Sequence, residues 1–170
     1  YWQNMKNKVN YNKIFKNKKV LITGHTGFKG SWLSAYLLSI GAKVHGISKD
    51  IPSKPSHFNE INLKKKISNS ILFDLIEKKK LKKKITEYKP DYIFHLAAQS
   101  LVGKSYKNPT DTWHSNTFGT INILEVLREI KRETVVVLIT SDKVYKNIET
   151  SKGYREDDVI GGIDPYGASK

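Results

Sequence analysis

The chain has 170 residues, a formal net charge of +14 and no cysteine. The lack of cysteine excludes disulfides and thiolate metal sites and suits a reducing cytoplasm, while the length predicts a single domain. No apolar run approaches the length of a membrane span, and residues 1–19 lack the apolar core of a signal peptide.

The N-terminal part of the chain precedes the first predicted strand. Residues 1–17 are predicted to be an extension, and residues 18–170 are predicted to form the folded domain. The first residue is not Met, so Met5 is a candidate for the true start. The extension is therefore left out of the predicted fold.

A strand predicted at Lys19–Thr23 leads into Gly24, Gly27 and Gly30 and into a helical apolar pattern over Phe28–Ile40. Strand, glycine turn and helix in this order form the phosphate-binding corner of dinucleotide folds. The glycines allow a tight turn, a close backbone approach to the pyrophosphate and close helix packing, and the helix N-terminus offers free N–H groups. The G-x-x-G-x-x-G spacing points to the short-chain dehydrogenase/reductase branch. The alternative is a purely structural turn.

Strand and helix patterns alternate along the rest of the chain, which is typical of a parallel sheet with helices on both faces. We therefore predict an α/β fold with a doubly wound, Rossmann-like parallel sheet. The fifth strand is apolar on both faces and has no predicted neighbour on one side. The sheet thus resembles one truncated after the fifth strand, as in the front half of a longer protein. The strands after the first are predicted at Lys43–Ile47, Ser70–Phe73, Tyr92–Leu96 and Thr134–Thr140.

A lysine-rich amphipathic helix is predicted at Asp74–Tyr88, where Pro90 ends it. Its lysines and those of Lys64–Lys66 raise the question of nucleic-acid binding. Specific nucleic-acid readers rely on Arg and interleaved aromatic residues, whereas Ile, Leu and Glu surround these lysines. The pattern favours a solvated helix face, and we expect no nucleic-acid partner.

A longer helix is predicted from Thr110 or Asp111, as N-cap, to about Lys131. Before it, residues Ile51–Asn62 contain two prolines and predict a loop that can hold a short helical turn. The expected apolar face of the long helix consists of Trp113, Thr117, Thr120, Leu124 and Leu127.

Tyr166 and Lys170 close the chain at a spacing that puts both on one face of a helix. A nearby ammonium stabilises a phenolate, so this pair is typical of proton transfer. The chain stops within the first turn of that helix, and an isolated turn is not expected to hold. No group of His, Asp and Glu has metal-ligand spacing, so no metal site is expected.

Several segments together resemble the extended short-chain dehydrogenase/reductases that act on nucleotide sugars, and among them the 4,6-dehydratases of the CDP-glucose type. The similarity covers residues 18–170, which correspond to the cofactor half of that family. The segments are Gly24–Trp32, His95–Gln99, Thr140–Lys143, Gly153–Glu156 and Asp164–Lys170.

The resemblance implies NAD as the cofactor and a nucleotide sugar, CDP-glucose, as the substrate. In the family reaction NAD takes a hydride from carbon 4, carbon 5 loses a proton, water leaves from carbon 6, and the hydride returns to carbon 6. Tyr166 would remove the 4-hydroxyl proton with help from Lys170, and Ser141 would bond to the 4-oxygen. Asp142 would protonate the leaving hydroxyl, and Lys143 would take the carbon-5 proton.

The cofactor contacts are expected at the carboxyl ends of the strands. Asp50 lies about twenty residues past the glycine corner, where an acid binds the ribose and disfavours a 2′-phosphate. Neighbouring Lys49 and Lys54 argue the reverse, so NAD is the preferred prediction over NADP. Asp74 resembles a family Asp that contacts adenine, or else serves as a helix N-cap. The expected contacts are Gly24, His25, Gly27, Phe28, Gly30, Asp50, Asp74, Leu75, Leu96, Ala97, Ala98, Thr140, Tyr166 and Lys170.

Two alternatives remain open: a related nucleotide-sugar 4-epimerase, disfavoured by the Asp142–Lys143 pair, and a non-catalytic dinucleotide-binding fragment. That pair can also be an ordinary exposed turn. His95 is expected to be a hydrogen-bonded strand-end residue, and Asn116 an organiser of the backbone. The resemblance further implies a cytoplasmic lyase of lipopolysaccharide biosynthesis, a homodimer or homotetramer when full-length, with no membrane partner. The isolated chain is expected to be inactive, because the sugar-nucleotide pocket belongs to the other half.

Overall fold

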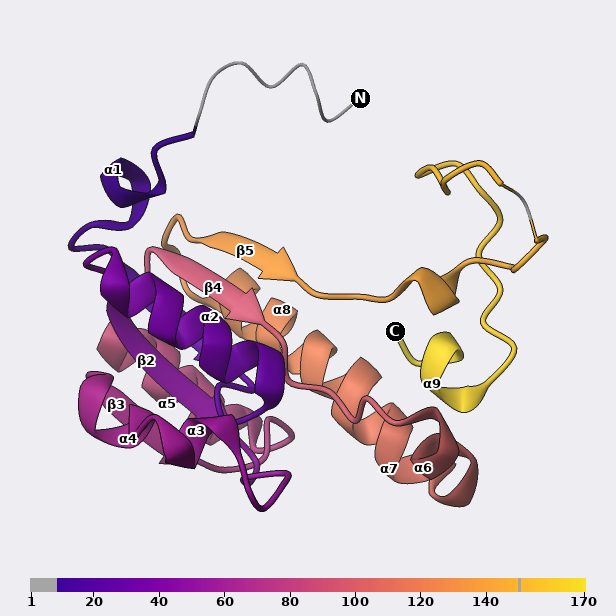
Figure 1. The fold of residues 1–170 in the computed structure, drawn as a ribbon, viewed down its shortest axis with the longest axis horizontal. Helices are drawn as coiled ribbons and strands as arrows, with labels where there is room; N and C mark the ends of the chain where they lie inside the picture. Colours follow the sequence, from indigo (N-terminus) through magenta and orange to yellow (C-terminus); the bar gives the residue numbers. More distant parts are fainter. Residues whose placement is uncertain (1–8, 150) are drawn as a thin grey trace.

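The computed structural model describes residues 9–149 and 151–170. Its centre is one five-stranded sheet in the order β3-β2-β1-β4-β5, in which every neighbouring pair is parallel (Figure 1). The chain winds outward from the central strand in both directions, which confirms the predicted doubly wound fold. The strands are β1 Lys19–Thr23, β2 Lys43–Ser48, β3 Asn69–Leu72, β4 Tyr92–His95 and β5 Val135–Leu138.

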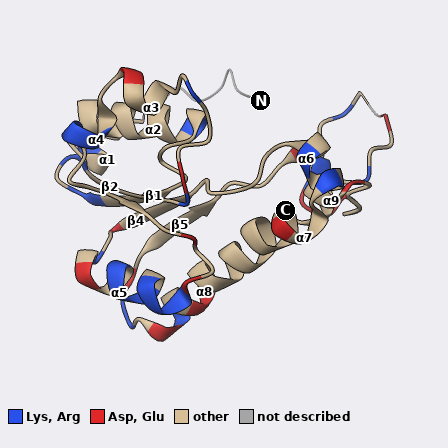
Figure 2. Cartoon of the chain, turned by 90° about the horizontal axis from the view of Figure 1, so that it is seen from below, with Lys and Arg blue, Asp and Glu red and all other residues tan. Residues whose placement is uncertain are grey.

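Helices connect the strands and cover both faces of the sheet. They are α1 Tyr11–Phe15, α2 Phe28–Ser39, α3 His57–Glu60, α4 Leu63–Lys66, α5 Lys78–Tyr88, α6 Val102–Lys107, α7 Pro109–Trp113, α8 Gly119–Glu129 and α9 Pro165–Ala168. A π-helical turn, His114–Phe118, joins α7 to α8, and a 3-10 turn lies at Asp142–Val144. Helices α2, α3 and α4 cover one face, and α5 and α8 cover the other (Figure 2).

The core has two halves because successive side chains of a strand point to opposite faces. On β1, Val20 and Ile22 pack on the α2 side with Leu37, and all three are buried. Leu21, between them, packs on the α5 side with Ile85. The central strand is thus buried on both faces, as its continuous apolar run predicts.

Part of the predicted extension belongs to the folded structure. Helix α1 precedes β1, and the ring of Phe15 lies 5.0 Å from that of Tyr92 and 6.1 Å from that of Phe94, centroid to centroid. These rings close the α2 side of the core near the start of β4. Met5, the candidate start, lies outside the described residues.

Two predicted helix starts are wrong. The lysine-rich helix was expected from Asp74, but α5 begins at Lys78, and Asp74 instead accepts a hydrogen bond from Ile76 N at 3.2 Å in the turn before it. The long helix begins at Pro109, whose missing N–H suits a first helical position, and not at Thr110 or Asp111. The turn α3 forms inside the predicted loop, whereas α4 and α6 are too short for their periodicity to be recognised.

The buried face of the long helix differs from the predicted apolar face. Trp113 and Leu124 are exposed, by 39% and 46%. Two features explain the difference: part of the buried face is polar, and a π turn holds one more residue than an α turn and so rotates α8 relative to α7. The residues that this helix buries are Thr112, Asn116, Gly119, Ile123 and Val126.

Strand β5 is the edge of the described sheet on its β4 side, as predicted. Val135 and Val137 point to the same side and are 54% and 38% exposed. An apolar edge of this kind offers unpaired backbone groups and uncovered side chains to a further element. Within the described ranges, no helix is long and apolar enough to cross a membrane.

Figure 2 shows the positively charged positions of α5 beside the acidic positions of α8. Three lysines of α5 form ion pairs with acidic residues of α5 and α8. The carboxylate of Glu129 in α8 forms ion pairs with Lys78 Nζ at 2.9 Å and with Lys82 Nζ at 2.7 Å. That of Glu87 forms an ion pair with Lys84 Nζ at 2.8 Å. The arrangement is that of a solvated, ion-paired helix face, and it links α5 to α8.

The two ion pairs of Glu129 predict that its contribution to the stability of the fold depends on pH. Hydrogen bonds from Lys82 and Lys78 lower the pKa of Glu129 from 4.5 to about 2. A pKa lowered by folding means that the carboxylate stabilises the fold above about pH 4.5 and that this contribution is lost as the pH falls toward 2. Glu129→Gln should therefore lower the melting temperature at neutral pH and low salt, by an amount that shrinks below pH 4.5 and in high salt. Glu133→Gln, also in an exposed position, is the control; a difference that does not depend on pH would contradict the assignment.

Candidate functional site at the carboxyl edge of the sheet

The glycine corner forms the centre of the candidate site. Gly24 has a φ of +76°, and an added Cβ would lie 2.7 Å from Ala97 N, so only glycine fits between β1 and the end of β4. Gly27 N donates to Gly24 O at 3.0 Å, and an added Cβ on Gly30 would collide with that same carbonyl. Helix α2 therefore starts directly after β1, with glycine at its N-cap position. Its first N–H groups are free to bind an anion.

His25 lies inside the corner and holds it to two strands. Its side chain is 0% exposed, with Nδ1 2.8 Å from Ser48 Oγ and Nε2 2.7 Å from Ser70 Oγ. Burial lowers the pKa of His25 to about 4, so the ring is neutral near pH 7. Gly46 makes room for this ring, since a Cβ there would overlap it. His25 can contribute to a cofactor site through its backbone, while its side chain braces the turn.

The residues that the sequence predicts to bind the adenosine part of the dinucleotide lie beside this corner. Asp50 is exposed, and its carbonyl accepts a hydrogen bond from Thr26 Oγ1 at 2.5 Å. Lys49 Nζ lies 2.8 Å from Asp74 Oδ2. Partial burial is the largest single influence on Asp74 and opposes its charged form. The hydrogen bonds from Lys49 and from the Ile76 amide, together with the positive charge of Lys49, outweigh it and lower the pKa of Asp74. The neighbouring Leu75 is buried, and its carbonyl accepts a hydrogen bond from Asn122 Nδ2 at 2.9 Å.

A buried polar chain runs from the corner under the end of β4. Ala97 N donates to Thr23 Oγ1 at 3.3 Å, and the same hydroxyl lies 2.6 Å from His95 Nδ1. His95 Nε2 lies 2.9 Å from Thr120 Oγ1 on α8. Burial, and secondarily the charge of Lys170, lower the pKa of His95 to about 4. His95 is thus a hydrogen-bonded structural residue, as predicted, and Leu96, Ala97 and Ala98 follow it as a half-buried segment at this edge.

Asn116 connects this edge to the end of the chain. Its Oδ1 accepts a hydrogen bond from Gln99 N at 2.7 Å, and its Nδ2 donates one to Ser169 Oγ at 2.8 Å. Thr117 Oγ1 also donates to the carbonyl of Ser169 at 2.9 Å. Asn116 lies in the π turn, and its role as an organiser of the backbone is confirmed.

The residues with expected roles in proton transfer gather where β5 ends. The 3-10 turn after Thr140 and Ser141 lies against α9 (Figure 1). An added Cβ on Gly167 would lie 2.6 Å from the carbonyl of Lys143, so the two backbones are in contact. Ser141 Oγ donates to Asp142 Oδ1 at 3.2 Å. Lys143 Nζ lies 3.6 Å from Asp164 Oδ2, so its ion pair is with a residue that the sequence did not single out for this role.

Helix α9 carries Tyr166 and ends just before Lys170. The chain was expected to end within a helical turn too short to hold by itself. The structure forms this turn at Pro165–Ala168, where tertiary contacts fix it, but Lys170 lies beyond its end and does not share a helical face with Tyr166. Asp164 caps it through Gly167 N at 2.8 Å, and Lys170 Nζ donates to Ile139 O at 2.8 Å. Burial lowers the pKa of Lys170. Tyr166 is half-buried on the same turn.

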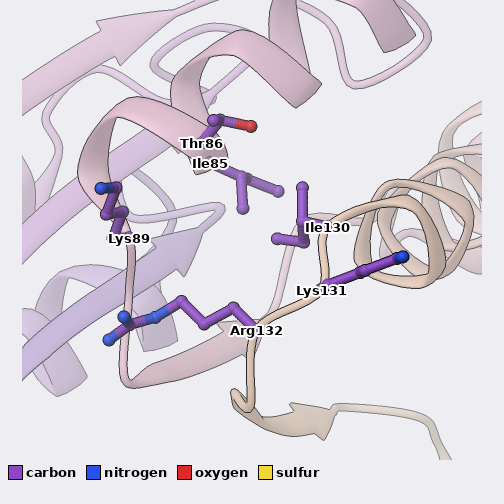
Figure 3. A pocket seen from close by; sticks show the side chains of 6 residues that line it. All are labelled: Ile85, Thr86, Lys89, Ile130, Lys131 and Arg132. Atoms are coloured by element: carbon purple, nitrogen blue, oxygen red, sulfur yellow. The ribbon is translucent and has the colours of Figure 1, made fainter.

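A pocket at the opposite edge of the sheet is unrelated to this constellation (Figure 3). Its cationic residues lie at the C-terminal ends of α5 and α8, where positive charge offsets the helix dipole, and Arg132 pairs with Asp91 at 3.0 Å. The described residues contain no group of three or more His, Cys, Asp or Glu that could hold a metal ion. The pocket is lined by Ile85, Thr86, Lys89, Ile130, Lys131 and Arg132.

Comparison with protein families shows one match over most of the chain. The family model described as GDP-mannose 4,6 dehydratase matches residues 21–170. CDP-glucose 4,6-dehydratase of Salmonella typhimurium is 45% identical over 157 residues, which cover 92% of this chain and 44% of that protein. The chain therefore spans less than half the length of this relative.

Solved structures share the fold. The epimerase Mth375 of Methanothermobacter thermautotrophicus is 26% identical with a TM-score of 0.80, covering 98% of this chain and 48% of the other. UDP-glucose 4-epimerase of Thermus thermophilus, solved in complex with NAD, is 28% identical with a TM-score of 0.76, covering 89% and 47%. Both matches place the described sheet and helices in about half of a longer chain.

The glycine corner yields a direct prediction. Gly30→Ala should lower the free energy of unfolding by about 1–3 kcal/mol, because the new methyl must push α2 away from the Gly24 carbonyl. It should also weaken the binding of NAD, the expected dinucleotide, since the amides of α2 move with the helix. Denaturant unfolding and calorimetric titration with NAD measure the two effects.

Gly103→Ala in α6 is the matched control, because an added Cβ there meets no atom within 4 Å. It should leave NAD binding unchanged. Equal behaviour of the two variants would contradict the account of the corner.

Proposed function

The chain belongs to the GDP-mannose 4,6 dehydratase family, and from this we propose that it is the NAD-binding half of an enzyme that dehydrates a nucleotide sugar. The proposed reaction converts CDP-glucose to CDP-4-dehydro-6-deoxyglucose. The observation that carries it is the contact between the Asp142–Val144 turn and α9, at the same sheet edge as the glycine corner. That contact gathers the residue types that the reaction needs.

NAD is the proposed cofactor. The free amides of α2 suit its pyrophosphate, and Asp50 suits the ribose hydroxyls. Lys49, which could have favoured a 2′-phosphate, is engaged by Asp74. When bound, NAD would accept a hydride from carbon 4 of the sugar and return it to carbon 6. The residues proposed to hold it are those expected from the sequence, with His25 acting through its backbone.

The chain's own residues would move the protons. Tyr166 takes the proton of the 4-hydroxyl, and the Lys170 ammonium stabilises the phenolate side of that exchange. Ser141 donates to the 4-oxygen. Once carbon 4 is a ketone, carbon 5 is acidic. Lys143, after its ammonium releases a proton to solvent, takes the carbon-5 proton and gives it back to carbon 5 when the hydride reaches carbon 6. Asp142 gives a proton to the 6-hydroxyl, which leaves as water.

A nucleotide-sugar 4-epimerase is the alternative function, which the likeness to the Thermus epimerase favours at the level of the fold. An epimerase eliminates no water and so needs neither Asp142 nor Lys143 as an acid and a base. The presence of both groups next to α9, and the 45% identity to a CDP-glucose dehydratase, support the dehydratase.

The wider context of the proposal follows from the proposed reaction. The product is a precursor of deoxysugars, which we propose to be incorporated into surface polysaccharides such as lipopolysaccharide. The lack of cysteine suits a reducing cytoplasm. We propose that the full-length form acts as a homodimer or homotetramer, with no nucleic-acid or membrane partner.

Lys143 tests the proposed function. In a full-length form, Lys143→Gln should slow water elimination by roughly a hundred- to ten-thousandfold, the usual contribution of a general base. The first oxidation should persist, because the carbon-5 proton is lost only after the ketone forms. NADH absorbance should therefore accumulate after addition of CDP-glucose. Lys146→Gln, in the same exposed segment, is the control, and unchanged turnover in Lys143→Gln would remove this residue from the reaction.

A further inference from the structure

Asp164 lies between the two segments that carry the proposed proton-transfer groups. It is 6% exposed and stands immediately before Pro165, the first residue of α9. Its Oδ1 accepts a hydrogen bond from Gly167 N at 2.8 Å, and its backbone carbonyl accepts one from Ala168 N at 2.9 Å. Through these bonds Asp164 holds the single turn that carries Tyr166.

The second carboxylate oxygen of Asp164 faces a different segment. Asp164 Oδ2 lies 3.6 Å from Lys143 Nζ. A buried carboxylate is costly without an opposing charge, and the ammonium of Lys143 supplies one. The neighbouring carboxylate, that of Asp142, accepts a hydrogen bond from Ser141 Oγ at 3.2 Å through its Oδ1.

The backbone around Asp164 is packed so that this geometry cannot easily shift. The carbonyl of Lys143 lies against Gly167, where an added Cβ would be only 2.6 Å from it. Gly161 N also donates to Val144 O at 2.8 Å, which ties the segment before Asp164 to the turn of Lys143. The carboxylate therefore has a fixed place relative to both turns.

We propose that Asp164 is a positioning residue that sets the locations of Lys143 and Tyr166 with one carboxylate. This inference rests on the proposed function, in which Lys143 takes the carbon-5 proton and Tyr166 the 4-hydroxyl proton. Asp164 touches neither the sugar nor the cofactor in this account. It holds the side chain of Lys143 beside α9, so the second proton transfer takes place next to the first.

Two substitutions separate the two tasks of the carboxylate. Asp164→Asn keeps an oxygen that accepts Gly167 N but loses the charge that holds Lys143. Asp164→Ala loses both. In a full-length form, Asp164→Asn should retain the melting temperature and the first oxidation, while water elimination falls by roughly ten- to a hundredfold, as expected for a misplaced catalytic group. Asp164→Ala should lose thermal stability and both steps.

A double-mutant cycle shows whether Asp164 acts through Lys143. In a Lys143→Gln background, Asp164→Asn should cause no further loss of elimination. An equal additional loss in that background, or unchanged elimination by Asp164→Asn alone, would overturn the inference.

A third measurement uses the chain of 170 residues and needs no activity. Lys143 should react slowly with acetic anhydride relative to the exposed Lys146, as read by peptide mass spectrometry, and Asp164→Asn should raise that ratio several-fold. An unchanged ratio would overturn the positioning role, whatever the reaction is. A wild-type full-length form that neither oxidises nor dehydrates CDP-glucose would instead count against the proposed function.

Discussion

The close packing of Gly30 against the carbonyl of Gly24 is the constraint on which the rest of the structure depends. It places the first turn of α2 at the end of β1, so the free amides of that helix face the carboxyl edge of the sheet. The same corner packs on Ala97 and buries His25 between β2 and β3. The cofactor corner, the end of β4 and the turn after β5 therefore share one edge, where ligands bind in doubly wound sheets.

Local signals predicted the sheet well, and non-local contacts account for most of what they missed. The apolar runs of β1 and β5 and the glycine spacing after Thr23 depend only on neighbouring residues. The predicted buried face of the long helix was wrong because Asn116 is buried with hydrogen bonds to Gln99 and Ser169. A hydrophobicity pattern does not show such bonds. Asp164 before Pro165 is a recognisable helix start, but its ion pair with Lys143 depends on how β5 and α9 meet.

The one-turn helix α9 illustrates how tertiary contacts replace length. A single turn is unstable alone, yet Asp164 caps it, Asn116 holds Ser169, and Lys170 is anchored on the carbonyl of Ile139. Asp164 is the N-cap of α9, whereas Asn116 lies in the π turn and Ile139 directly follows β5. The position of Tyr166 is thus determined by the whole edge, and a change at any anchor should move the proposed proton transfers together.

The central claim is that this edge supports dehydration, in which a hydride leaves carbon 4 and returns to carbon 6. The most direct measurement is to give CDP-glucose deuterated at carbon 4 to a full-length form and to locate the label in the product by NMR. The account predicts deuterium at carbon 6 of CDP-4-dehydro-6-deoxyglucose. Deuterium retained at carbon 4 of an epimerised sugar, or no product at all, would contradict it.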